Sequence, residues 1–202
     1  MKKALAHLTS ADPVLARLIE RVGACRIRYL QPVFGTLARS IVFQQLNGRA
    51  ASTIFERLRS ACGPDGPMTA ATVLKLRPAR MRSLGVSPQK TAYIRDLARK
   101  TRDGEVDFDG LRAAPDSEVI ERLVQVKGIG VWTVQMFLIF ALRRPDVLPT
   151  ADYGIRVAMK QQYGLPELPK PPEMERLAAP WLPYRSVACW YLWRSLDNQP
   201  GL

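Results

Sequence analysis

Apolar residues recur at intervals of three and four along almost the whole chain, whereas runs that alternate apolar and polar residues are scarce. The first pattern places apolar side chains on one face of an α-helix, and the second would be needed for half-buried β-strands. Proline and glycine residues separate the periodic segments. The sequence therefore predicts an all-α fold. The expected helices span residues 12–22, 33–46, 48–62, 69–82 (in two short pieces), 88–103, 116–126, 130–142, 151–163, 173–180 and 184–198.

The composition favours a folded protein with a polyanionic partner. The 202 residues are 47% hydrophobic, which is enough to bury a core as one domain or as two small lobes. Thirty Lys and Arg against eighteen Asp and Glu give a formal charge of +12. Such a charge favours contact with the phosphates of a nucleic acid, although a merely soluble basic surface would also account for it.

Three further features exclude other classes of protein. Cys25, Cys62 and Cys189 are widely spaced and form no CxxC pair, so we expect small core residues in a reducing compartment and neither a zinc site nor an iron–sulfur cluster. The start of the chain has two lysines but no sustained apolar stretch behind them, which argues against a secretory signal. The longest apolar segment, 131–142, is too short to span a bilayer.

A glycine-rich turn joins two of the predicted helices. The helix at 116–126 ends at Lys127-Gly128-Ile129-Gly130, and an almost wholly apolar helix follows. Gly128 and Gly130 are expected to adopt backbone conformations that other residues avoid, and to expose amide groups that can bind a phosphate. Ile129 would pack the two helices together. Because many helix–helix turns contain Gly-x-Gly, this motif alone supports a DNA-binding hairpin and an ordinary turn equally.

Five stretches occur in order between residues 33 and 198. They are SIVFQQLNGRAASTIFERL (40–58), LGVSPQKTAYIRDLA (84–98), LVQVKGIGVWTVQMFLIFAL (123–142), RRPDVLPTADYGIRV (143–157) and WLPYRSVACWYLWR (181–194). Together they resemble the helix-hairpin-helix (HhH-GPD) DNA glycosylase superfamily, and most closely its alkylated-base branch, that of 3-methyladenine DNA glycosylase II, in a compact form without an N-terminal β domain. The resemblance implies one glycosylase unit over 1–202. It would consist of two helical lobes, 33–142 and 1–32 with 143–202, and a DNA-binding cleft between them.

Asp152 matches the essential aspartate of that superfamily. Breaking an N-glycosidic bond moves positive charge onto the deoxyribose, and a carboxylate under the sugar stabilises this charge. Asp152 could also orient or deprotonate the attacking water. The residue equally suits the N-cap of the helix at 151–163, and only the order of the motifs favours the catalytic role.

The resemblance also implies which chemistry is missing. Relatives that cleave the DNA strand carry a lysine two residues after the second hairpin glycine, where it forms a Schiff base with the sugar. This chain has Trp132 there, and Lys127 lies on the wrong side of Gly130 to replace that lysine. We therefore expect a monofunctional glycosylase without lyase activity.

Aromatic residues are expected to form the base pocket. Trp132 and Trp193 match pocket positions of the alkyl-purine branch, where a cationic base on an aromatic ring gains about 0.5–2 kcal/mol. Met136 stands where relatives can have an aromatic residue. Both tryptophans could instead belong to the core, which is the expected place of Trp181, Trp190 and Tyr191.

Several residues match positions that contact DNA in the family. Gln45 and Leu46 match the wedge that fills the gap left by a flipped nucleotide, although a helix-end turn with Leu46 buried is the alternative. Ser87 and Lys90 are expected to contact the DNA backbone, and Ser87 also suits a helix N-cap.

The hairpin is also expected to bind a phosphate and a cation. Gly128 and Gly130 would anchor a phosphate, and the main-chain carbonyls of Val124, Val126 and Ile129 match positions that hold a monovalent cation, Na⁺ or K⁺, in relatives. No cofactor is expected to be required.

Taken together, these features predict a monomer that hydrolytically excises alkylated bases, such as 3-methyladenine or 7-methylguanine, from double-stranded DNA. No membrane association is expected. It would be cytoplasmic and nucleoid-associated in a bacterium, or nuclear in a eukaryote. Two alternatives stay open. One is a glycosylase for oxidised or deaminated bases, whose uncharged leaving group needs more acid help, and the other is a non-catalytic module that only binds lesions.

Overall fold

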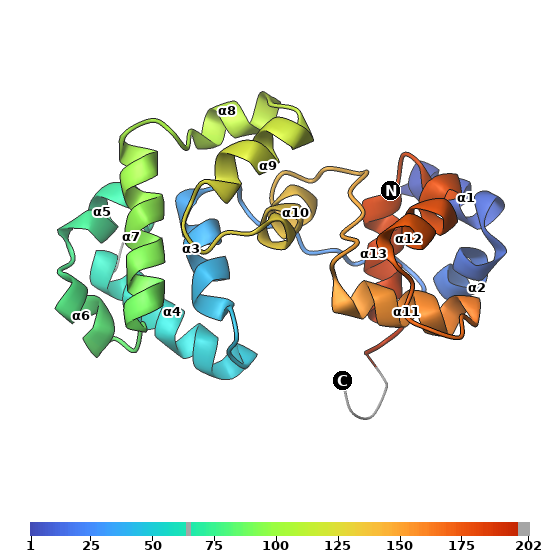
Figure 1. Ribbon diagram of the computed structural model, residues 1–202, viewed down its shortest axis with the longest axis horizontal. Helices are drawn as coiled ribbons and strands as arrows, with labels where there is room; N and C mark the ends of the chain where they lie inside the picture. Colours follow the sequence, from blue (N-terminus) through green and yellow to red (C-terminus); the bar gives the residue numbers. More distant parts are fainter. Residues whose placement is uncertain (64–65, 198–202) are drawn as a thin grey trace. The chain divides into compact units, whose positions relative to one another are not determined.

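The computed structural model describes residues 1–63 and 66–197, in which helices joined by turns and loops make up all the regular structure (Figure 1). The prediction of an all-α fold is confirmed. The helices are α1 (Lys2–Ala11), α2 (Pro13–Val22), α3 (Phe34–Phe43), α4 (Gly48–Cys62), α5 (Ala70–Lys75), α6 (Pro78–Ser83), α7 (Pro88–Arg102), α8 (Phe108–Ala113), α9 (Asp116–Val124), α10 (Val131–Phe140), α11 (Tyr153–Tyr163), α12 (Pro171–Ala178), the 3₁₀ turn η1 (Ala179–Trp181) and α13 (Arg185–Arg194).

The chain divides into two compact units. Residues 1–29 and 138–202 form the terminal unit, and residues 30–137 form the central unit. The boundaries between the units lie at residues 29–30 and 137–138. The boundaries expected from the sequence, 32–33 and 142–143, lie a few residues further along the chain. The division within α10 follows from its composition, because a helix that is apolar on all sides can pack its two ends into different cores.

The terminal unit is built around α13. Helix α2 packs against α1 and α13, and α11 packs against α13. Trp181 and Tyr191 are fully buried and Trp190 nearly so, as predicted. Buried Asp12 caps α2 by accepting hydrogen bonds from the amides of Val14 and Leu15, and its other oxygen accepts from Tyr163 Oη at 2.5 Å and Trp181 Nε1 at 2.8 Å. One carboxylate therefore ties α2 to α11 and η1.

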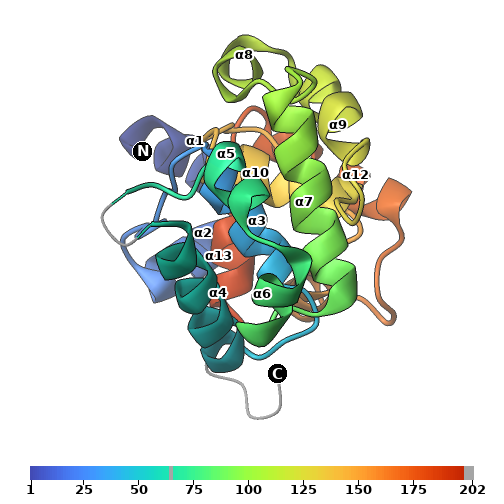
Figure 2. The same cartoon turned by 90° about the vertical axis from the view of Figure 1, so that its left-hand side faces the viewer.

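The central unit is built around α7. Helix α7 packs against α3, α5 and α6, and α3 packs against α4. Figure 2 shows α7 running lengthwise through this group of helices. Its buried side includes Ile94, Leu97 and Ala98. Ser87 caps its N-terminus, since Ser87 Oγ accepts a hydrogen bond from the amide of Lys90 at 3.2 Å.

Helices α1 and α8 were not expected from the sequence, and α3 and α13 end early. Helix α13 ends at Arg194 instead of residue 198, which lies outside the described residues. Helix α1 buries only Ala4 and Leu8, and α8 buries only Leu111, so neither shows a clear apolar period. Helix α3 ends at Phe43 instead of residue 46, because the C-cap Gln44 has a non-helical ψ of 130° and Gln45 then adopts a left-handed φ of 56°.

Candidate functional site

Asp152 is the last residue of the loop that joins α10 to α11. It is the N-cap of α11, and its Oδ1 accepts a hydrogen bond from the amide of Ile155 at 2.8 Å. The same oxygen accepts a hydrogen bond from Trp193 Nε1 at 3.0 Å. Asp152 is only 8% exposed. The capping interaction therefore exists, and it orients a nearly buried carboxylate against an aromatic residue of α13.

Gly154 leaves room beside the contact between Asp152 and Trp193. A Cβ atom at position 154 would lie 3.3 Å from Trp193 Cδ1 and 3.2 Å from Asp152 Oδ1, which is tighter than ordinary contact. Glycine is otherwise unfavourable within a helix. With no side chain at residue 154, the indole and the carboxylate meet without crowding.

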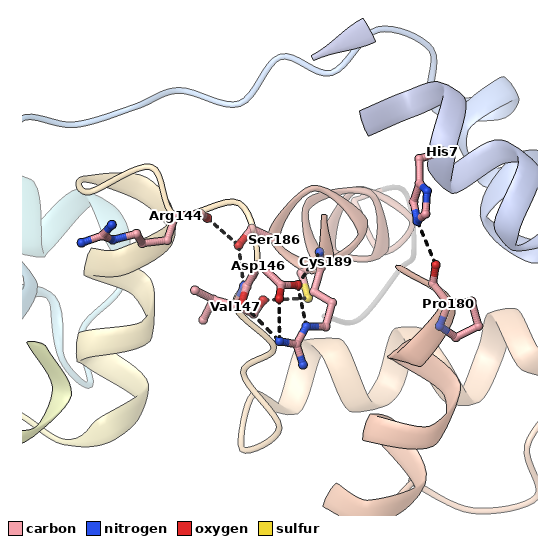
Figure 3. Close-up of polar contacts among 8 residues, drawn as sticks. His7, Arg144, Asp146, Val147, Pro180, Ser186 and Cys189 are labelled. Atoms are coloured by element: carbon pink, nitrogen blue, oxygen red, sulfur yellow. Dashed lines mark hydrogen bonds and ion pairs between the residues drawn. The ribbon is translucent and has the colours of Figure 1, made fainter. Parts of the chain in front are cut away.

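The N-terminal end of α13 holds the loop that leads to Asp152. Arg185 forms a two-pronged ion pair with Asp146, with Nε–Oδ1 at 2.6 Å and Nη2–Oδ2 at 2.8 Å. Ser186 Oγ accepts from the Val147 amide at 2.9 Å and donates to the Arg144 carbonyl at 2.7 Å. Figure 3 shows Asp146, Val147 and Ser186 close together. The loop and the aromatic partner of Asp152 are thus fixed by one helix.

The thiol of Cys189 lies beside the loop that leads to Asp152. Cys189 Sγ lies 3.9 Å from the Val147 carbonyl, and burial raises the pKa of this thiol, so Cys189 is an inert core residue as predicted. Cys25 and Cys62, which were expected in the core as well, are only half-buried. Away from this loop, His7 Nε2 forms a hydrogen bond with the Pro180 carbonyl at 3.0 Å (Figure 3).

Trp193 also lines a hollow in the terminal unit, which we call the terminal hollow. Its volume is about 850 Å³, and the Phe140 and Trp193 rings lie 5.8 Å apart on its wall. Arg26 and Arg28, which make no hydrogen bond or ion pair within the described ranges, also line it. The full lining is Val22, Gly23, Ala24, Arg26, Arg28, Phe140, Trp190, Trp193 and Arg194. The hollow combines aromatic surface with positive charge.

Gln44, Gln45 and Leu46 form a turn between α3 and α4, which we call the 44–46 turn; Gln44 is half-buried, and the other two residues are exposed. Leu46 is 41% exposed, so the alternative in which it is buried is wrong. Gln45 is exposed as well, and α4 starts directly after the turn with Asn47 as its N-cap. An apolar side chain is therefore presented to solvent on a short turn.

A second hollow lies in the central unit beside this turn. This central hollow has a volume of about 480 Å³ and brings together three predicted site residues, Gln45, Trp132 and Met136. Trp132 is 45% exposed and does not belong to the core. The rest of the lining is Arg39, Ser40, Phe43, Gln44 and Thr133.

The hairpin at 127–130 differs from expectation at one glycine. Gly128 has φ 79°, and a Cβ there would overlap the ring of Tyr93, so glycine is required. Gly130 does not have a positive φ, and a Cβ there would meet nothing within 4 Å. The expectation that Gly130 adopts a conformation closed to other residues is therefore wrong. Ile129 is buried, as predicted.

The polar groups of Ser87 and Lys90 bind the protein itself. Ser87 is the N-cap of α7, which was the alternative to a DNA contact. Lys90 Nζ donates to the carbonyls of Val42 at 2.8 Å and Gln44 at 2.6 Å. Burial lowers the pKa of the Lys90 ammonium. The predicted phosphate contact of Lys90 would have to compete with these bonds.

Some residues of these sites were not predicted. Arg26, Arg28 and Phe140 of the terminal hollow were missed, as was Gly154. The two arginines lie in a segment without helical periodicity, where a basic pair could have suggested a phosphate contact. Gly154 had a local signal, namely a glycine in the first turn of a predicted helix.

Residues 1–63 and 66–197 contain no cluster of three or more His, Cys, Asp or Glu arranged to hold a metal ion. None of the helices in these ranges is both long enough and apolar enough to cross a bilayer.

The chain is similar to known proteins over most of its length. Residues 38–183 match the model of the HhH-GPD superfamily base excision DNA repair proteins. DNA-3-methyladenine glycosylase 1 of Schizosaccharomyces pombe is 33% identical over 200 residues, which cover 96% of this chain and 87% of the relative. A putative DNA-3-methyladenine glycosylase of Bacillus subtilis is 34% identical over 170 residues, which cover 82% of this chain and 59% of the relative.

Solved structures give the same result. The S. pombe 3-methyladenine DNA glycosylase in complex with abasic DNA matches with a TM-score of 0.84 at 33% identity, over 96% of each chain. The DNA-3-methyladenine glycosidase of Bacillus halodurans matches with a TM-score of 0.86 at 34% identity, over 96% of this chain and 89% of the other.

Proposed function

The chain belongs to the HhH-GPD superfamily of base excision DNA repair proteins, and we propose that it is a monofunctional DNA glycosylase for alkylated bases. It flips a base of the 3-methyladenine or 7-methylguanine type out of duplex DNA and releases it by hydrolysis. The observation that carries this proposal is the nearly buried Asp152 carboxylate, which α11 and Trp193 hold in one orientation.

Asp152 is the catalytic residue in this proposal. As the glycosidic bond lengthens, positive charge develops on the deoxyribose, and a carboxylate held in a water-poor site stabilises that charge more strongly than one in bulk water. Asp152 also orients the water that attacks the sugar, or accepts its proton. An alkylated purine is already cationic, so its departure needs little help from an acid.

Trp193 and Phe140 supply the aromatic wall that a cationic base prefers. The guanidinium groups of Arg26 and Arg28 would repel such a base if they stood alone. We propose that they bind phosphates of the damaged strand, which cancels this repulsion and explains why they have no protein partner in the described ranges.

The central unit contributes the contacts that open the duplex. Leu46 and Gln45 on the exposed turn replace the flipped nucleotide in the base stack. Trp132 and Met136 line the central hollow beside the turn and offer an apolar surface to the opened strand. Trp132 has no amine, which supports hydrolysis without a Schiff base.

The hairpin approaches a phosphate through the main chain of Gly128 and Gly130. We propose that the main-chain carbonyls of Val124, Val126 and Ile129, which are hard oxygen donors, hold a monovalent cation, although the Val126 carbonyl also accepts a hydrogen bond from the Ile129 amide at 3.0 Å. Na⁺ or K⁺ bound there would add positive charge next to the phosphate. We propose that the enzyme works wherever genomic DNA lies, in the nucleoid or in the nucleus.

The proposal is tested by measuring the bases that wild-type protein releases from methylated duplex DNA. We expect 3-methyladenine or 7-methylguanine in the released fraction, together with intact abasic strands. Duplexes that contain 8-oxoguanine, uracil or hypoxanthine serve as the comparison. Release from these alone would identify a glycosylase for oxidised or deaminated bases, and tight lesion binding without any release would identify a non-catalytic module.

A further inference from the structure

One side of α7 binds both segments that we propose to contact DNA. Lys90, Tyr93 and Asp96 follow one another at intervals of three residues, which places them in succession along one side of the helix. Lys90 contacts the end of α3 at the 44–46 turn, whereas Tyr93 and Asp96 contact the hairpin at 127–130. The two segments are far apart in sequence, yet they are held by the same helix.

Lys90 binds the end of α3 through two main-chain carbonyls. Val42 lies in the last turn of α3 and Gln44 is its C-cap, and Lys90 Nζ lies 2.8 Å and 2.6 Å from their carbonyl oxygens. The last carbonyls of a helix lack partners within the helix and carry partial negative charge, so a cation there is favourable. Two of the three donors of the ammonium group are used in this way.

The 44–46 turn needs such support because its backbone is unfavourable. Gln45 has φ 56°, in the left-handed region that residues other than glycine rarely adopt. Such a conformation persists only when the surroundings hold it in place. Since Gln45 and Leu46 are exposed, their own side chains cannot hold it. Lys90 binds the residue directly before the strained position.

The turn is also tied to the hairpin. Gln44 Nε2 donates a hydrogen bond to the Gly128 carbonyl at 2.8 Å. The ring of Tyr93 lies against the space left by the missing Gly128 side chain, and Gln89 Nε2 donates to Tyr93 Oη at 2.7 Å. The wedge and the phosphate anchor are therefore linked directly and through α7.

Asp96 completes the support of the hairpin. Its Oδ2 accepts a hydrogen bond from the Lys127 amide at 3.0 Å, and the residue is buried. A buried carboxylate that accepts a main-chain N–H restricts the position of the hairpin directly before Gly128. With Lys90 at one end and Asp96 at the other, α7 determines the spacing between the turn and the hairpin.

We propose that Lys90 is a positioning residue that holds the 44–46 turn in the geometry needed to extrude a base, and that it does not bind a DNA phosphate. This inference rests on the proposed function for its catalytic consequence. Its structural part, the hold of Lys90 on the turn, is independent of any activity.

The test uses Lys90→Met, which keeps an apolar stem of similar length and removes the ammonium. In the free protein, amide hydrogen exchange at residues 44–48 should become faster, while exchange at the hairpin stays slower than at the turn. Affinity for undamaged duplex and its dependence on salt should stay unchanged. Single-turnover release of the methylated base should fall ~10- to 100-fold, as expected when a substrate-positioning group shifts.

A phosphate contact predicts a different pattern. If Lys90→Met weakens binding to undamaged duplex and lowers the salt slope by about one, the proposal is overturned. Unchanged exchange at residues 44–48 would overturn it as well. Lys90→Arg should restore much of the excision rate, because a guanidinium can also donate to two carbonyls.

Arg95→Met is the matched control. Arg95 lies on the same helix and donates to the Leu76 carbonyl at 2.7 Å, at the end of α5. This variant loses a comparable contact but should leave exchange at the turn and the rate of base release near wild type. An equal loss of release in both variants would mean that general destabilisation explains the effect, which contradicts the proposal.

A double-mutant cycle adds a second criterion. If Lys90 acts through the wedge, Leu46→Ala should remove most of the effect of Lys90→Met on base release, so the two losses should not add. Additive losses would contradict the proposal. If the wild-type protein releases no methylated base, the proposed function fails, and the exchange measurement still decides whether Lys90 holds the turn.

Discussion

The indole Nε1 of Trp193 donates a hydrogen bond to Asp152 Oδ1 at 3.0 Å, and the same oxygen accepts the Ile155 amide. Helix capping and a catalytic role are therefore compatible for Asp152, because the cap fixes the direction in which the carboxylate points. Trp193 then connects that carboxylate to the aromatic wall of the terminal hollow.

Asp152→Asn should keep the fold and lose catalysis. Asparagine caps helices as well as aspartate does, so the free energy of unfolding should change little. The amide provides no negative charge for the sugar cation, and single-turnover base release should fall by ~10²-fold or more, with lesion affinity retained. Asp109→Asn, which alters a carboxylate that is 97% exposed, is the control. Release within a few-fold of wild type would show that another group is catalytic.

Gly154→Ala should separate activity from stability. The added Cβ crowds Trp193 and Asp152, so we expect release to slow by about tenfold while affinity for undamaged duplex is kept. Alanine favours the helix by roughly 0.5–1 kcal/mol, which offsets part of the crowding in thermal unfolding. Gly35→Ala in α3, where the nearest atom to the new Cβ is 3.7 Å away, should leave release unchanged. Equal rates in the two variants would contradict the role of Gly154.

Borohydride should not trap the protein on abasic DNA. Trapping requires a lysine amine that forms a Schiff base with the sugar, and the position that supplies it in strand-cleaving relatives holds Trp132. The experiment measures covalent adducts by gel and by mass spectrometry. As a positive control, Trp132→Lys introduces the amine at that position. An efficient adduct of the wild-type chain on any lysine near the lesion would refute the monofunctional assignment.

Arg26→Gln combined with Arg28→Gln should weaken binding to damaged and undamaged duplex alike. Each lost phosphate contact reduces the slope of log affinity against log salt by about one, so the slope should fall by about two. The control is Lys2→Gln with Arg17→Gln, which removes the same charge from exposed positions of the terminal unit. If the two double variants lower the salt slope equally, net charge alone explains the change, and the terminal hollow binds no specific phosphate.

The two hairpin glycines should differ. Gly128→Ala introduces strain at φ 79° and overlaps Tyr93, so it should destabilise the protein by about 1–3 kcal/mol in urea unfolding. Gly130→Ala meets no protein atom within 4 Å and should leave stability unchanged. A loss of DNA affinity in Gly130→Ala would then report a close approach of phosphate. Full affinity in this variant would show that no phosphate comes near Gly130.

The sequence by itself determined the fold class and the order of the motifs. Helical periodicity and the glycine and proline breaks are local properties, so they are visible in any stretch of chain. The identity of residue 132 as tryptophan excludes a Schiff base there whatever the packing. The cap at Asp152 is also local, because its partner Ile155 is only three residues away.

Only the tertiary structure decided which side chains meet. Lys90 and Val42 are 48 residues apart, and Trp193 and Asp152 are 41 apart, so no local pattern could pair them. The sequence suggested a contact with the DNA backbone for Lys90 because it lies in one of the stretches that resemble the glycosylase family. The packing of α7 against α3 brought helix-end carbonyls within reach of its ammonium, and those carbonyls accept two of its hydrogen bonds inside the fold. The open space at Gly130 and the crowding at Gly154 have the same cause, because both depend on which atoms would surround an added Cβ.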